Sequence, residues 1–137
     1  MTDFAQRGPL GLKATKGTTR EAKPRRVKPI SDKRAAHWRS PRGKAEKAYM
    51  AAVKQLPCII CGAPAPSDAH HPICERFGGR KVSGFDVIPL CHSGCHQDGP
   101  RAIHTDKTAW MQRNGSDRDY IEPTRNQVPK KMWEDWI

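Results

Sequence analysis

The pattern of apolar and polar positions divides the chain into an amino-terminal part without periodicity and a structured remainder. Residues 1–39 show neither helical nor strand spacing, which is typical of a disordered or loosely attached arm. Ser40 and Pro41 then supply a helix N-cap and a first helical residue. Lys44–Gln55 follows with its alanines on one side and lysines on the other, so the pattern predicts a helix that ends before Pro57.

Two short apolar segments, Asp68–Ile73 and Phe85–Leu90, have the length and composition of strands. The loop between them holds three glycines and three basic residues, which predicts a β-hairpin with a long connection. The polar stretch from Cys91 predicts a short helix that is broken at Gly99-Pro100. Ile103–Arg113 has the spacing of a small amphipathic helix. Together these elements predict a small α+β fold with flanking helices.

The chain is too short and too polar to rely on a hydrophobic core alone. It has 137 residues, of which 36% are apolar, with 12 prolines and 11 glycines. A single small domain of this kind usually needs disulfides or a metal for stability. No apolar run approaches 18 residues and the start lacks a secretory apolar segment, which predicts a cytoplasmic protein. Thiols stay reduced there, so the five cysteines favour a metal site over disulfides.

Positive charge is concentrated towards the amino-terminal end. The formal net charge is +11; residues 1–54 contain 15 Lys and Arg against 4 Asp and Glu, whereas residues 55–137 contain 10 of each. A basic arm beside a neutral domain is typical of nucleic-acid-binding proteins, and the alternative is a solubilising tail. The distribution favours nucleic acid, with Arg25 and Arg26 as candidate contacts in the arm.

Four of the five cysteines have the spacing of a zinc site. Cys58 and Cys61 form a CxxC pair followed by glycine, and Cys91 and Cys95 form a second pair thirty residues downstream. Two such pairs predict a closed tetrahedral centre of the structural type. Cys74 is then the spare thiol.

Four histidines in the same region remain to be explained, since a centre with four cysteine ligands has no open position for them. His70 and His71 fall on the first predicted strand, where neighbouring side chains point to opposite faces, so they cannot both bind one ion. One can bind a metal while the other faces a substrate. His96 and His104 can complete a three-histidine site with open positions, which is a catalytic design. Asp68 is predicted to be a turn residue and not a ligand.

The combination CIICG, AHHPI, GGRKVSGFDVIPLCHSGCH and IH resembles the zinc-containing HNH (ββα-metal) nucleases. It is most similar to the Ref-type recombination-enhancement nucleases of phages, over about residues 56–115. The resemblance implies a hairpin and helix that hold one divalent cation and cleave phosphodiesters. It also implies a basic, poorly ordered amino-terminal arm and action together with RecA filaments.

The resemblance also implies residue roles. His71 corresponds to the general base that activates water, and His70, His96 and His104 correspond to the ligands of the catalytic cation. Asp86 occupies the position of the family's central Asn and would orient the base or the loop. Asp in place of Asn is a departure from the family pattern.

The same residue types suit phosphodiester hydrolysis on chemical grounds. Histidine is a competent base at neutral pH, and a cation held by neutral imidazoles keeps its charge for the phosphate. Arg76, Arg80 and Lys81 in the glycine-rich loop would hold the nucleic-acid backbone, unless they only solvate the loop. Imidazole ligands accept Mg²⁺ or Mn²⁺ and also Zn²⁺, so the catalytic cation stays open.

The sequence therefore predicts a metal-dependent HNH-like DNA endonuclease with a structural zinc, consisting of an arm (residues 1–39) and a nuclease domain (residues 40–137). A zinc-stabilised nucleic-acid-binding module that cleaves nothing is the main alternative, and a small RNA- or ribosome-associated zinc protein is a weaker one. Trp110 is predicted to anchor the core and not to stack on a base.

Overall fold

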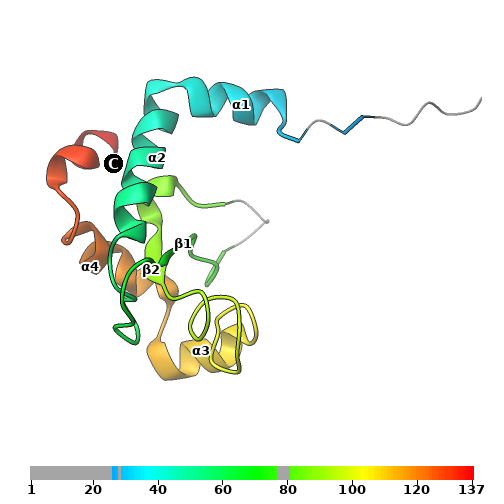
Figure 1. Ribbon diagram of the computed structural model, residues 1–137, viewed down its shortest axis with the longest axis vertical. Coiled ribbons are helices and arrows are strands. Elements are labelled where there is room, and N and C mark those ends of the chain that lie inside the picture. Colours follow the sequence, from blue (N-terminus) through cyan, green and yellow to red (C-terminus); the bar gives the residue numbers. More distant parts are fainter. Residues whose placement is uncertain (1–25, 28, 77–80) are drawn as a thin grey trace, which may run out of the picture.

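A computed structural model describes residues 26–27, 29–76 and 81–137 as a small mixed α+β protein (Figure 1). These residues form four α-helices, one two-stranded sheet and several short 3-10 helices. The elements in order are α1 (Asp32–Arg39), α2 (Pro41–Lys54), β1 (Asp68–His70), η2 (Gly84–Asp86), β2 (Ile88–Leu90), α3 (Lys107–Asn114), η3 (Asp117–Tyr120), α4 (Ile121–Arg125), η4 (Lys130–Met132) and η5 (Glu134–Trp136).

The predicted disordered arm, residues 1–39, is wrong for residues 32–39. These residues form the helix α1, which packs against α2. Ser31 caps α1, and its side chain accepts a hydrogen bond from the Arg34 N–H. Ser40 separates the two helices: its hydroxyl donates to the His37 carbonyl and accepts from the Gly43 N–H, which caps α2. The helix predicted after Ser40 is confirmed. Residues 1–25 and 28 lie outside the described residues.

The predicted β-hairpin is confirmed, although its strands are shorter than expected. β1 and β2 pair antiparallel, with Asp68 opposite Leu90 and His70 opposite Ile88. β1 ends two residues before Pro72, which has no N–H to donate to a partner strand. The long connection returns through η2 before β2 begins.

The helix predicted from Cys91 is wrong, because this segment forms turns. Gly94 and Gly99 adopt positive φ angles of 120° and 94°, which a continuing α-helix does not allow. The next helix, α3, is confirmed, but it begins later than predicted, at Lys107, and ends at Asn114. The Asp106 carboxylate caps it and accepts the Ala109 N–H at 2.9 Å. These turns fold the chain between β2 and α3 back on itself.

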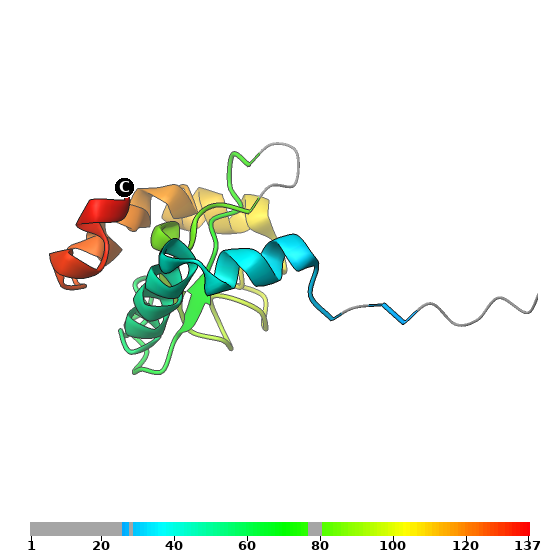
Figure 2. The ribbon, with the colours of Figure 1, turned by 90° about the horizontal axis from the view of Figure 1, so that it is seen from above.

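Two apolar clusters flank the hairpin. The first surrounds Trp110, which is fully buried and confirms its predicted role as a core anchor, and it includes Ile88 and Leu90 of β2. The second surrounds Tyr49 of α2 and Phe85 of η2. The carboxyl-terminal turns pack on this second cluster, so the end of the chain lies beside α2 (Figures 1 and 2).

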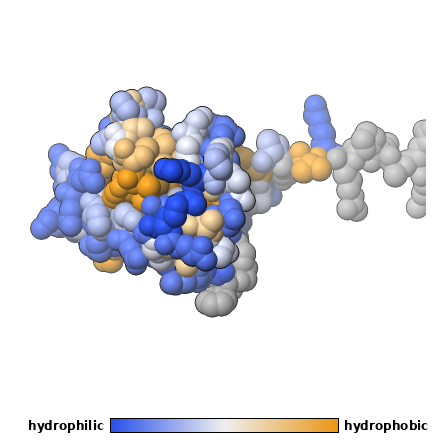
Figure 3. Space-filling view, turned by 90° about the horizontal axis from the view of Figure 1, so that it is seen from below, coloured by the Kyte–Doolittle hydropathy of each residue, from blue (hydrophilic) through white to orange (hydrophobic). Residues whose placement is uncertain are grey.

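The surface is mostly hydrophilic on the face that Figure 3 shows, as the polar composition leads one to expect. On the face seen from the α3 end, hydrophilic residues surround a patch of apolar surface (Figure 3). Among the described residues, no helix has the length and apolar character needed to cross a bilayer.

Candidate metal centres

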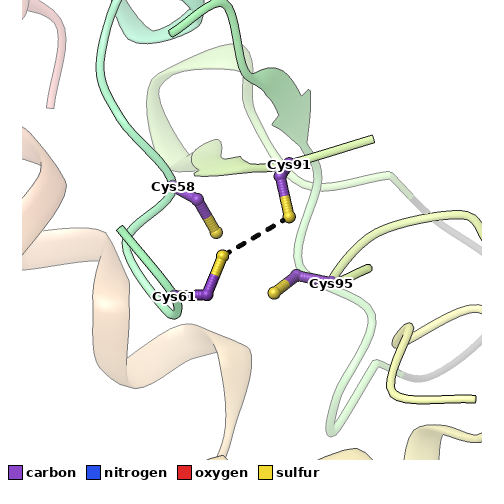
Figure 4. A group of neighbouring side chains, drawn as sticks. All are labelled: Cys58, Cys61, Cys91 and Cys95. Atoms are coloured by element: carbon purple, nitrogen blue, oxygen red, sulfur yellow. Dashed lines mark hydrogen bonds between the residues drawn. The ribbon is translucent and has the colours of Figure 1, made fainter. Parts of the chain in front are cut away.

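Four cysteines meet between the loop after α2 and the turns that follow β2 (Figure 4). Each of Cys58, Cys61, Cys91 and Cys95 offers a sulfur, and these atoms lie within 4.8 Å of one another. The Cys61 and Cys91 sulfurs are 3.6 Å apart. A regular tetrahedron with zinc–sulfur bonds of about 2.3 Å has edges of about 3.8 Å, so the cluster has the dimensions of a zinc centre.

The local backbone prepares the first cysteine pair for a metal. The Gly62 N–H donates to the Cys58 carbonyl, and the Cys58 N–H donates to the Ala63 carbonyl. These bonds close a tight loop in which Gly62 adopts a positive φ of 73°, a conformation that glycine allows without steric cost. Burial alone would raise the pKa of the Cys58 thiol, but backbone N–H groups of residues 60, 61 and 91 outweigh burial and lower it to about 7. A thiolate is the form that binds zinc.

The second pair differs because the pKa of both of its thiols is raised, with burial as the largest cause. Neighbouring sulfurs raise the pKa of Cys95 further; for Cys91, Cys95 lowers the pKa and the Cys61 and Cys58 sulfurs raise it. Four sulfurs this close cannot all be anionic without a cation among them. The donor set therefore fits a zinc ion, and Cys74, which is buried elsewhere, lies outside the group.

Three histidines form a second cluster from segments far apart in the sequence. One ring nitrogen each of His70, His96 and His104 lies within 4.8 Å of the others, and the ring centroids are 5.0–5.5 Å apart. His70 is 1% exposed, His96 is largely buried and His104 faces solvent. The structure therefore brings together the three imidazoles predicted as ligands, with an opening on the side of His104.

Backbone hydrogen bonds close the eight-residue gap between His96 and His104. The turn at Gly99 reverses the chain, after which the Ile103 N–H donates to the Cys95 carbonyl and the His104 N–H donates to the His96 carbonyl. Cys95 of the sulfur cluster and His96 of the histidine cluster are adjacent in the sequence. The two candidate centres are therefore held by the same folded turn.

Buried Asp117 fixes the orientation of His70. The His70 Nε2 lies 2.9 Å from the Asp117 Oδ2, and the same oxygen accepts the Ile73 N–H at 2.7 Å. A carboxylate only accepts, so Nε2 carries the proton and Nδ1 keeps its lone pair. That Nδ1 is buried and has no hydrogen-bond partner among the described residues. An orphaned lone pair beside two further imidazoles is the environment expected of a metal ligand.

Asp68 plays the same part for His96. Its Oδ2 accepts from the His96 Nδ1 at 2.7 Å, which leaves the His96 Nε2 as the free acceptor, 3.5 Å from the Gln97 amide nitrogen. The same oxygen also accepts from the His92 Nδ1 at 2.8 Å. Asp68, His92 and His96 are thus close enough to form a third candidate group, but their hydrogen bonds already account for the proximity.

Burial favours the neutral form of two imidazoles of the cluster, His96 and His104. It is the largest cause of the lowered pKa of His96, to which His70 adds, and of His104, to which His96 adds. Burial would raise the pKa of Asp117, but hydrogen bonds from His70 and from the Ile73 N–H outweigh it and lower that pKa. Neutral imidazoles next to ionised carboxylates are the protonation states that metal binding requires.

His71 lies just beyond the last residue of β1 and is not part of the three-histidine group, as predicted for one member of the His70-His71 pair. It lines a separate groove of about 650 Å³ between α1, α2 and the chain that leads into η2. Burial, and then the charges of Lys81 and His70, lower its pKa, so the ring is neutral at neutral pH. Its Nδ1 is buried and makes no hydrogen bond within the described part of the chain.

Of the other predicted site residues, the structure places one beside His71, places others elsewhere, and leaves two outside the described residues. Lys81 is exposed and lines the groove with His71, and Arg76 is half-buried. Arg26 is exposed, whereas Arg25 and Arg80 lie outside the described residues. The structure does not bring Asp86 to His71. The Asp86 carboxylate is paired with Arg125, which also donates to the Phe85 carbonyl and so joins α4 to η2.

Sequence reasoning missed both supporting carboxylates. Asp117 is 47 residues from His70, and no local motif marks it. Asp68 was expected in a turn, but it is the first residue of β1, where the alternation places it on the same face as His70. That two-residue spacing is the one signal that pointed to its role.

A family model described as a protein of unknown function (DUF968) matches residues 14–127, which is most of the chain. The chain therefore belongs to the DUF968 family. No curated protein and no solved structure matches it.

Proposed function

We propose that this protein is a metal-dependent endonuclease of the HNH type that hydrolyses phosphodiester bonds in DNA. One observation carries the proposal. Three imidazoles converge around the orphaned Nδ1 of His70, and the next residue, His71, stays outside the ligand group and lines a groove. A ligand cluster that opens to solvent beside an unligated neutral histidine is the combination that metal-assisted hydrolysis requires.

In this proposal the cluster of His70, His96 and His104 holds a divalent cation, Mg²⁺ or Mn²⁺ or also Zn²⁺. When bound, the cation would supply positive charge to the phosphate and to the departing oxygen. Asp117 and Asp68 hold the rings of His70 and His96 in the orientation that presents a lone pair. His104, the exposed member, lies where a phosphate could approach.

His71 would take the proton from the attacking water. A neutral ring is required for this step, and burial together with Lys81 keeps the His71 pKa below its usual value. The exposed ammonium of Lys81, on the same groove, would hold a neighbouring phosphate. The cysteine cluster would bind a structural zinc and take no part in the reaction.

Relaxation of supercoiled plasmid with Mg²⁺ or Mn²⁺ tests the proposal. Wild-type protein should nick the plasmid, and His71→Ala should be slower by about 10²–10⁴-fold because it lacks the base. His104→Ala should lose activity through weaker cation binding. His92→Ala is the matched control, because His92 is an exposed histidine of the same segment that lies outside the cluster.

Equal cleavage by wild type and His71→Ala would contradict the proposal. Loss of activity in His92→Ala with normal activity in His104→Ala would place the cation at Asp68, His92 and His96 instead. A wild-type protein that binds DNA but never cleaves it would leave the non-catalytic zinc module as the function.

The partnership with a RecA-type filament, the phage origin and the contacts of Arg25 and Arg26 with DNA stay predictions. Each rests on the resemblance or on the charge distribution alone. Adding recombinase filaments and ATP to the nicking reaction tests the first of them.

A further inference from the structure

The groove that holds His71 has a chemistry of its own. Its walls come from α1 and from residues 81–84, and its cationic members are Lys33, Arg34 and Lys81. Among the described residues of the lining, the one carboxylate belongs to Glu46, which is 5% exposed.

Glu46 is engaged by groups around it. The His37 Nε2 lies 2.7 Å from one carboxylate oxygen, and the other oxygen accepts from the Ser83 hydroxyl at 3.1 Å. The Arg42 guanidinium is also within ion-pair distance at 3.5 Å. The cations of the groove therefore face no unpaired acid among its described lining residues, and the groove can attract an anion.

An aromatic side chain also lines the groove. Trp38, at the end of α1, is half-buried, in contrast to fully buried Trp110. The Lys47 ammonium lies 5.1 Å from the centre of the Trp38 ring. Basic side chains combined with an accessible aromatic ring are the features by which proteins bind unpaired nucleotides, through phosphate contacts and base stacking.

The size of the groove selects a single strand. Cavities of about 300–1,000 Å³ hold ligands of the size of a drug or a nucleotide, and this groove has about 650 Å³. A base within a double helix is paired and stacked inside it, so a base must be unpaired to enter a cavity of this size. We propose that the groove binds an unpaired nucleotide of a DNA strand, with its phosphates on Lys33, Arg34 and Lys81 and its base against Trp38.

This inference rests on the proposed function in one respect: the bound strand lies beside His71, the proposed base. It names single-stranded DNA, or an unpaired segment of a duplex, as the preferred substrate. Binding can be measured without cleavage, so a failure of the groove and a failure of the nuclease are distinguishable.

Fluorescence anisotropy of the full chain with a labelled oligonucleotide, single-stranded or as a duplex, tests the groove without added divalent cation. Wild type should bind the single strand more tightly. Trp38→Ala should weaken single-strand binding about five-fold or more and duplex binding less than two-fold, because stacking needs an unpaired base. Trp38→Phe should retain most of the affinity.

The cations are tested separately, in case Trp38→Ala disturbs the packing of α1. A Lys33→Ala, Arg34→Ala double variant should make the salt dependence of single-strand binding shallower by about 1.4, at about 0.7 per lost phosphate contact. Lys130→Ala with Lys131→Ala is the matched control, because these exposed lysines lie on η4, outside the groove lining.

Any of three results would overturn the proposal. The first is a wild-type protein that binds the duplex at least as tightly as the single strand. The second is a folded Trp38→Ala protein, or a Lys33→Ala, Arg34→Ala protein, whose single-strand binding matches that of the lysine control. The third is equal weakening of both DNA forms by Trp38→Ala, which would contradict base stacking.

Discussion

The sulfur cluster and the histidine cluster are built by the same hairpin and turn, yet they differ in how they are supported. The cysteines come as two short pairs whose own loops provide the geometry, and backbone N–H groups act directly on Cys58. The histidines come from three places and depend on side-chain carboxylates, of which Asp117 lies far along the chain. A centre made of local pairs suits a structural role, whereas one oriented by distant carboxylates can stay open on one side.

The comparison predicts that the two centres fail in different ways. Loss of the sulfur cluster should unfold the domain, and loss of the histidine cluster should leave a folded, inactive protein.

Cys58→Ala should abolish cooperative folding. The apolar clusters are small, and binding of a structural zinc is worth about 10–16 kcal/mol in zinc-finger peptides, which is comparable to the whole stability of about 5–15 kcal/mol of a typical domain. Circular dichroism during heating, together with zinc analysis, measures this. Cys74→Ala is the control, since Cys74 is a buried cysteine outside the cluster, and it should keep its zinc and unfold cooperatively.

Brief treatment with a weak chelator should remove cleavage activity without unfolding the protein. Both clusters reach the surface, at His104 and at Cys61, but thiolate ligands select zinc, whereas Mg²⁺ and Mn²⁺ prefer oxygen ligands, so three imidazoles should release such a cation more readily. Activity should return when Mg²⁺ or Mn²⁺ is added. Simultaneous loss of activity and helical signal would show that the two centres are not independent.

Asp117→Asn should weaken cation binding by about 10- to 100-fold, the usual effect of removing a carboxylate behind a histidine ligand. The amide oxygen can still accept the Ile73 N–H, so most of the local structure should survive. Isothermal titration with Mn²⁺ measures the affinity. An unchanged affinity in a folded protein would mean that His70 is a core histidine and not a ligand.

Asp68→Asn should have a smaller effect of the same kind. Its carboxylate is one-third exposed, so solvent weakens its effect on His96, whereas that of Asp117 is fully buried. The same titration, done side by side, ranks the two carboxylates. A larger loss in Asp68→Asn than in Asp117→Asn would favour the site formed by Asp68, His92 and His96.

The parts of the structure that sequence could predict are those with local signals. The CxxC spacing predicted the cysteine group, the cap at Ser40 predicted α2, and strand alternation predicted that only one of His70 and His71 joins the ligand group. A break was predicted at Gly99-Pro100, and the chain does turn there before backbone hydrogen bonds join His104 to His96.

The parts that sequence could not predict depend on distant contacts. The helix α1 has no buried residues and little amphipathic character, so its sequence carries no clear helical signal. In the folded protein α1 packs on α2, and His37 of α1 contacts Glu46 of α2. The pairing of Asp86 with Arg125 and of Asp117 with His70 joins segments about forty residues apart. No periodicity or short motif records such pairs, so a residue such as Asp86 was assigned by resemblance and the structure gave it a packing role.

Native mass spectrometry of the zinc- and manganese-loaded protein tests most directly whether two separate centres exist. Wild type should carry two metal ions, of which a weak chelator removes one, and His104→Ala should carry a single zinc that the chelator leaves in place. One metal ion in both proteins, or loss of both ions together from the wild type, would contradict the account.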